Sequence, residues 1–216
     1  MGIREQARAD MTAQILAAAR AEIAEHGGGG LSMRAVAREV GLVSSAVYRY
    51  FPTREALLTA MIIESYEHLA EVLGEVTEDD PGERWRRLAH AFRGWALEHR
   101  HEYQLIYGTP VPGYVAPAET VPAAGAVAGY FIAAVSAASG SVERHFTDAE
   151  LADQLDAPAG EFGVEPSAMG AVLAELSALV GVVSLELSGH FVGTADPADA
   201  LFAAMVERQV QTLGLV

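Results

Sequence analysis

Three adjacent residues, Tyr48, Arg49 and Tyr50, have side chains that could hold nucleic acid. A tyrosine hydroxyl and an arginine guanidinium both bind phosphate oxygens, and arginine also pairs with base edges in the major groove. The residues just before them are small: Ser44, Ser45 and Ala46. A serine hydroxyl can donate or accept a hydrogen bond, and an alanine methyl can contact the methyl group of thymine. This group of residues predicts a DNA-reading surface.

Two short helices and a long one would be needed to present these side chains. Ser32 is a candidate N-cap, Gly41 allows a tight turn, and Ser44 or Ser45 could cap the next helix, which Pro52 would end. The glycine run 27–30 would end the first helix. Apolar spacing predicts helices over about residues 8–26, 32–40, 44–51 and 54–76. Two short helices joined by a glycine turn and packed on a third form a helix-turn-helix.

The helical period separates an inward face from a DNA-contacting face. Val47 and Phe51 lie four residues apart and suit the core. Tyr50 and Arg54 lie near the start of the following helix, where hydroxyl and guanidinium groups commonly hold phosphates. We expect the opposite DNA strand to be held by Ser32 and Arg34. For an isolated Tyr-Arg-Tyr-Phe run the alternative is that Tyr48 belongs to the core and Arg49 is merely solvated. The surrounding pattern of cap, glycine turn, small residues and proline favours a DNA-binding role.

The charge distribution restricts DNA contact to one end of the chain. The 216 residues carry a net charge of −15, yet residues 1–54 hold seven arginines against five carboxylates. A cationic head on an anionic body can approach DNA only through the head.

The alanine-rich and leucine-rich composition, with 7% aromatic residues, favours an all-α fold. The absence of cysteine excludes disulfides and thiolate metal sites.

The segment LSMRAVAREVGLVSSAVYRYFPTREALL resembles the N-terminal domain of TetR-family transcriptional regulators over about residues 8–60. The resemblance implies that Tyr48 contacts a base or a phosphate and that Tyr50 and Arg54 contact phosphates. Two departures are the long glycine run and Arg54, where lysine is common. A second segment, WALEHRHEYQLIYGTPVPGY, resembles a subgroup of the same family. Together the two resemblances imply a DNA-binding domain over 1–54 and an effector-binding and dimerisation domain over 55–216.

Helical patterns continue through the body of the chain. We expect one long helix or two abutting ones over Trp85–Gly108, and further helices over about 123–139, 167–191 and 197–213. Residues 142–166 are only loosely patterned, and no stretch is typical of a strand. The fold class that follows is all-α, with an N-terminal helix-turn-helix domain and a C-terminal helical domain.

The resemblance implies an effector pocket between the central helices of the body. The aromatic and sulfur side chains that could line it are Phe92, Trp95, Tyr103, Tyr107, Tyr130, Phe131 and Met169. Such pockets are mostly apolar with a few placed polar groups. Aromatic residues at helical spacing are more often plain core, so that alternative stays open. The prolines 110, 112 and 117 could shape a pocket entrance or simply a surface loop.

The resemblance also implies a homodimer. The two last helices would pair with their twofold mates through Val172, Leu176, Leu179, Val183, Leu187, Leu201 and Met205. A twofold dimer would place two recognition helices about one DNA turn apart, roughly 34 Å, and would read a palindrome. The alternative is an ordinary monomer core.

Other kinds of chemistry find little support. His99 and His101 are two residues apart and would point in nearly opposite directions on a helix, which is poor geometry for one metal ion. We find no nucleophile, paired catalytic carboxylates or phosphate loop, so no catalytic site, metal or cofactor is expected. A helical enzyme or metal carrier would need such a constellation.

The N-terminus lacks an apolar signal core, and the run LSALVGVVSL is shorter than the ~20 residues that cross a bilayer.

The function that these observations favour is a cytoplasmic DNA-binding repressor, released from a palindromic operator by a small, largely apolar effector and making no membrane contact. The alternative is a helix-turn-helix regulator without a small-molecule effector, controlled by a protein partner or by its own level. The sequence does not separate these two.

Overall fold

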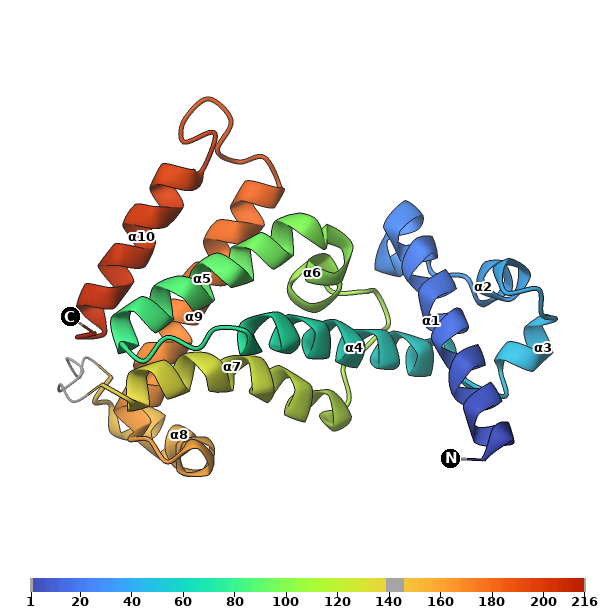
Figure 1. The fold of residues 1–216 in the computed structure, drawn as a ribbon, viewed down its shortest axis with the longest axis horizontal. Helices are drawn as coiled ribbons and strands as arrows, with labels where there is room; N and C mark the ends of the chain where they lie inside the picture. The colour runs from blue at the N-terminus through green and yellow to red at the C-terminus, as the bar shows by residue number, and fades with distance from the viewer. Residues whose placement is uncertain (1, 139–145, 216) are drawn as a thin grey trace. The chain divides into compact units, whose positions relative to one another are not determined.

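The computed structural model describes residues 2–138 and 146–215, and Figure 1 traces them as a ribbon. Every regular element within these two ranges is helical, which confirms the expected fold class. The helices are α1 (Ile3–Gly30), α2 (Met33–Glu39), α3 (Ser44–Val47), α4 (Arg54–Gly74), α5 (Pro81–Glu98), α6 (Arg100–Tyr107), the 3-10 turn η1 (Ala118–Thr120), α7 (Val121–Ser136), α8 (Ala149–Phe162), α9 (Pro166–Leu187) and α10 (Asp199–Thr212).

The described chain forms two compact units. The first contains the chain up to Tyr66 together with His101–Pro122, and the second contains Glu67–Arg100 and the chain from Ala123 onward. The expected DNA-binding head, residues 1–54, lies wholly within the first unit. That unit also takes in a segment from the expected effector domain, and this segment is described with the head below.

The head follows its local sequence signals closely. The Ser32 hydroxyl oxygen accepts a hydrogen bond from the Ala35 backbone N–H at 3.3 Å and so caps α2. Gly41 adopts a φ of +68°, which provides the turn between α2 and α3. The Thr53 hydroxyl accepts from the Ala56 N–H at 3.0 Å, at the start of α4. The predicted helix-turn-helix is therefore present, although α3 ends at Val47 and residues 48–50 form a turn.

The glycine run does not simply end the first helix. Gly27, with φ +70° and ψ 167°, interrupts α1 immediately after the expected end at His26. The chain then returns to helical geometry through Gly30. Because L-residues with side chains rarely adopt a positive φ, glycine suits this break.

The second unit is held by buried polar side chains as well as by its apolar core. Helix α5 packs against α9 and α10, and α8 packs against α9 (Figure 1). The Trp85 indole N–H donates to Gln209 Oε1 at 3.1 Å, and the Gln209 amide donates to the Glu175 carbonyl oxygen at 2.8 Å. Since Gln209 is fully buried, these two bonds satisfy its polar groups while tying α5, α9 and α10 together.

Helix α8 was not expected from the loosely patterned region 142–166, part of which lies outside the described residues. The Asp148 side chain caps it by accepting from the Leu151 N–H at 3.1 Å, and Gly163 ends it with φ +67°. Only Ala159 of this helix is buried, and Pro158 lies inside it. A proline inside the helix and so few buried residues make it difficult to predict this helix from sequence.

Two stretches, Ala118–Ser136 and α9, are long and apolar enough to cross a membrane by length and composition alone. The run LSALVGVVSL, which is shorter than about 20 residues, lies within α9, which has 22 residues. One side of α9 is packed into the second unit through Val172, Leu179 and Val183. Buried core helices of soluble proteins commonly meet the same criteria of length and composition.

Candidate nucleic-acid interface

The exposed surface around α3 carries most of the predicted DNA-binding side chains. Tyr48 is 46% exposed, and Arg49, Ser45 and Arg34 are exposed as well. Val47 and Phe51 are buried in the core, as predicted for the inward face. The expected separation of an inward face and an outward face is therefore present.

Ala46 differs from the expectation. It is only 5% exposed, because α3 begins at Ser44 and the helical turn carries Ala46 toward the core. The exposed apolar side chain at the start of α3 is instead Val43, at 70%. Val43 occupies the N-cap position that the sequence reading assigned to Ser44 or Ser45. Ser44 is half-buried.

Arg54 also differs, because its guanidinium is bonded within the chain. Its Nη2 donates to the carbonyl oxygens of Gly28 and Gly29 at 2.7 and 3.0 Å, and its Nε donates to that of Leu31 at 3.0 Å. Carbonyl groups at the end of a helix lack intrahelical partners and carry partial negative charge, so they attract a cation. In this structure the Arg54 side chain holds the glycine segment, and its phosphate contact stays a prediction.

Tyr50 is half-buried beside the first turns of α1. The Arg8 guanidinium carbon lies 5.5 Å from the centre of the Tyr50 ring, a cation–π arrangement. A shallow surface hollow is lined here by Arg4, Glu5, Ala7, Arg8 and Tyr50. The sequence reading missed Arg4 and Arg8, since nothing in their spacing relates α1 to the turn after α3.

The arginines of the head divide into two groups. Arg20 forms an ion pair with Glu64, and Arg54 is bonded to carbonyl groups as above. The other five are exposed and form no ion pair within the described ranges: Arg4, Arg8, Arg34, Arg38 and Arg49. Exposed guanidinium groups that are not neutralised by a carboxylate are available to phosphates and base edges. The arrangement suits binding to a nucleic-acid duplex.

Two family models match this chain. One describes bacterial regulatory proteins of the tetR family and matches residues 15–61. The other describes the C-terminal domain of tetracyclin repressor-like proteins and matches residues 85–209, more than half of the chain. This chain belongs to the TetR family of transcriptional regulators.

Relatives agree with this assignment. The HTH-type transcriptional regulator Rv1816 of Mycobacterium tuberculosis is 34% identical over 202 residues, which cover 88% of this chain and 86% of the relative. The crystal structure of the regulatory protein SCO4313 has a TM-score of 0.81 at 32% identity, covering 97% of this chain and all of that one. A tetR-family regulator from Rhodococcus RHA1 shares the fold, with a TM-score of 0.62 at 18% identity and cover of 94% and 96%. This TetR-family chain is thus a helix-turn-helix transcriptional regulator, in a family of DNA-binding proteins rather than enzymes.

The connector between α6 and η1, residues 108–117, packs on the head of this TetR-family protein. Leu105 of α6 and Val111 and Tyr114 of the connector are half-buried against the head core, while the prolines 110, 112 and 117 are exposed. A Cβ on Gly28 would lie 2.9 Å from Val111 Cγ2, so glycine is needed for this close approach. The Tyr114 and Thr59 hydroxyl groups are hydrogen-bonded at 2.9 Å. The connector is therefore a surface loop whose apolar side chains belong to the DNA-binding unit.

The predicted pocket residues are divided between the two units. Phe92, Trp95, Phe131 and Met169 belong to the second unit and are at most 3% exposed, and Tyr130 there is half-buried. Tyr103 and Tyr107 belong to the first unit, where the Tyr107 ring lies 5.4 Å from Tyr103 and 6.0 Å from Tyr66. Burial raises the pKa of Tyr107 well above its ordinary value, with a smaller contribution from the two neighbouring tyrosines.

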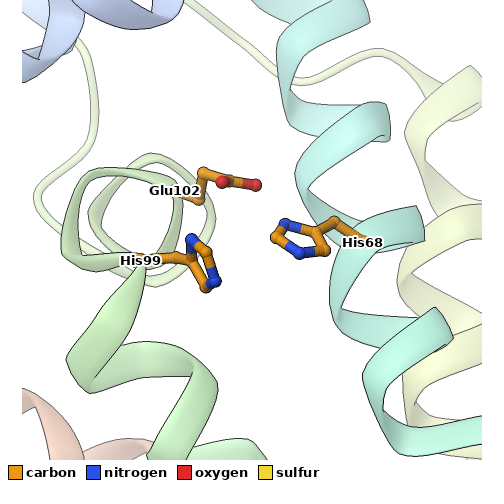
Figure 2. Close-up of side chains that lie close together, drawn as sticks. All are labelled: His68, His99 and Glu102. Atoms are coloured by element: carbon orange, nitrogen blue, oxygen red, sulfur yellow. The ribbon is translucent and has the colours of Figure 1, made fainter.

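Two histidines lie together in the second unit, His68 on α4 and His99 just after α5 (Figure 2). Their ring centres are 4.5 Å apart, and the Trp95 N–H donates to His68 Nδ1 at 3.3 Å. Two imidazoles could supply half of a four-coordinate zinc site. However, a tryptophan N–H only donates, so His68 Nδ1 accepts and the proton of the neutral ring lies on Nε2. A metal ion on His68 would have to displace either the Trp95 N–H from Nδ1 or the proton from Nε2. Glu102, also drawn in Figure 2, belongs to the first unit.

The predicted dimer residues differ in how accessible they are. Val172, Leu179 and Val183 are at most 1% exposed within the chain's own core. Leu176, Leu187 and Met205 are half-buried, and Leu201 is 39% exposed. Leu173, which the sequence reading missed, is 41% exposed and lies one helical turn before Leu176. The accessible apolar stripe of α9 is therefore rotated from the predicted one.

We expect Arg54→Ala to lower the free energy of unfolding of the full-length protein by about 2 kcal/mol, because three carbonyl groups lose a charged donor. Chemical denaturation followed by circular dichroism measures this change. Arg34→Ala is the matched control: its side chain is exposed, and we expect a change within about 0.5 kcal/mol. Equal losses in both variants would contradict the structural role of Arg54.

Proposed function

We propose that this regulator is a cytoplasmic repressor that occupies a palindromic operator as a homodimer and leaves it when a small, largely apolar effector binds. The observation that carries the DNA-binding part is the group of five exposed arginines without internal ion pairs, in the same unit as the exposed Tyr48. The remainder of the chain, residues 55–216, has seven arginines against 24 carboxylates and repels DNA. Contact is thereby directed to the head.

Arg49 is proposed to read bases and Arg34 to hold phosphate. We expect Arg49→Ala to weaken binding to a preferred operator at least tenfold and to relax its sequence preference, because a bidentate base contact contributes about 1–3 kcal/mol of discrimination. Arg34→Ala should weaken binding to all duplexes by a similar factor. Mobility shifts on the promoter beside the protein's own coding region, and on scrambled duplexes of equal length, measure both effects.

Two outcomes of this comparison would count against the proposal. Equal losses on all duplexes for both variants would refute base reading by Arg49. Unchanged binding in both variants would refute the proposed DNA-binding face as a whole.

Effector release needs a physical link between the body and the head. The connector supports one, because Val111 and Tyr114 pack on the head while the chain runs directly from α5, in the second unit, through α6 to the segment that carries them. Helix α4 is a second link, since it is continuous from Arg54 to Gly74. A ligand shifts such an equilibrium only by the difference between its affinities for the two states.

We expect an effector to lower operator affinity by about 5-fold to 150-fold, the usual range of coupling between two sites. A library of apolar small molecules can be screened for binding by the rise in thermal midpoint, and each binder tested in the mobility shift. Tyr114→Phe, which removes the hydrogen bond to Thr59, should reduce the effect of an active compound. Binders that never change operator affinity would contradict effector release.

One observation favours the alternative of a regulator without a small-molecule effector. Four of the predicted lining side chains are at most 3% exposed, as in a filled core: Phe92, Trp95, Phe131 and Met169. In that case the same screen would yield no binders. Control of the regulator would then lie with a protein partner or with its own level.

The proposed dimer interface uses the accessible stripe of α9 and its neighbour on α10. We expect Leu173→Asp to convert the dimer to monomers and to weaken operator binding, because it places a charge in an apolar interface. Leu185→Asp is the matched control: this leucine is 45% exposed and lies about 120° around the helix from Leu173. Light scattering during size-exclusion chromatography measures both, and a Leu173→Asp dimer would contradict this interface.

A further inference from the structure

Val43 is an unusual residue for its place in the fold. It is the N-cap of α3, its side chain makes no capping hydrogen bond, and it is 70% exposed. Serine, threonine, aspartate and asparagine are preferred at this position because their side chains accept from the first free N–H groups, and valine is among the least favourable choices. The free protein gains neither a cap nor a buried apolar contact from Val43.

The neighbours of Val43 place it on the proposed DNA-binding surface. Tyr48 and Arg49 are exposed on the same short segment, and so is Ser45. The other apolar residues of this segment turn toward the core: Leu42 is half-buried, while Ala46 and Val47 are buried. Val43 is thus the exposed apolar side chain at the start of α3.

The major groove offers one prominent apolar group, the C5-methyl of thymine. The first residues of a recognition helix are the ones directed toward base edges. We propose that Val43 packs against a thymine methyl group in each half-site and so specifies thymine at one operator position. This inference rests on the proposed DNA-binding function. The contact is made by the side chain and requires nothing of the backbone N–H groups of α3.

The contact can be tested by removing the methyl group from the DNA. Duplexes selected from a randomised pool by the full-length wild-type protein are resynthesised with uracil replacing each thymine in turn, and dissociation constants are measured by mobility shift. We expect one uracil position per half-site to weaken wild-type binding about fourfold, the value of one buried methyl group. In Val43→Ala the same replacement should change binding less than twofold.

Val115→Ala is the matched control, since Val115 belongs to the same unit and is 87% exposed, on the connector. It should keep the wild-type response to uracil. If Val43→Ala also keeps the full fourfold response, the proposal is wrong while DNA binding stands. If the wild-type protein selects no duplex, the DNA-binding proposal fails and this inference fails with it.

A second variant separates DNA reading from folding. Val43→Ser restores a capping side chain, so we expect its thermal midpoint to rise by roughly 2–4 °C. The same variant should lose the response to uracil, because the hydroxyl cannot replace the apolar contact. A more stable Val43→Ser protein that still distinguishes thymine from uracil fourfold would overturn the proposal.

Discussion

An acidic chain can bind DNA only through a surface where its own carboxylates do not neutralise its arginines. This protein carries a net charge of −15, and its structure meets that constraint through ion pairing. In the second unit, arginines are engaged with carboxylates of the same unit: Arg86 with Glu207, Arg93 with Glu186, and Arg208 with Glu175. In the head, five arginines remain exposed without such partners in the described chain. The proposed DNA-binding face follows from this difference.

The geometry of the head depends on Arg54 and on the glycines that it binds. Four consecutive glycines cannot hold one conformation by themselves, because glycine has the largest backbone freedom to lose. The Arg54 guanidinium holds the carbonyl groups of this segment, and the missing side chain at Gly28 lets Val111 approach. One arginine thus connects the end of α1, the start of α4 and the place where the connector docks. A lysine could not donate in this forked geometry.

Local chemistry explains which features of the head could be predicted. The Ser32 cap, the Gly41 turn and the inward pair Val47 and Phe51 depend on neighbours within a few residues, so their spacing specifies them. Arg54 could not be assigned in this way, because a guanidinium can bind either phosphate oxygens or carbonyl oxygens and only the fold brings the carbonyls to it. Placing the N-cap of α3 one or two residues too late put Ala46 on the outward face and left Val43 without a role.

The body of the chain shows a different limit. Apolar residues occur around most of α9, so residue type cannot tell a side chain buried in the chain's own core, such as Leu179, from one open to a partner, such as Leu173. Helix α8 presents the opposite difficulty, because it buries little and contains Pro158. In both cases tertiary packing, rather than the local pattern, decides the outcome.

The salt dependence of operator binding tests the central claim most directly. If the head's exposed arginines hold phosphates, the logarithm of the association constant should fall linearly with the logarithm of the salt concentration. Each phosphate contact contributes a slope of about −0.9, so a dimer with about ten such arginines should show a clearly negative slope no steeper than about −9. A slope near zero on a specifically bound operator would contradict the claim that these arginines contact DNA.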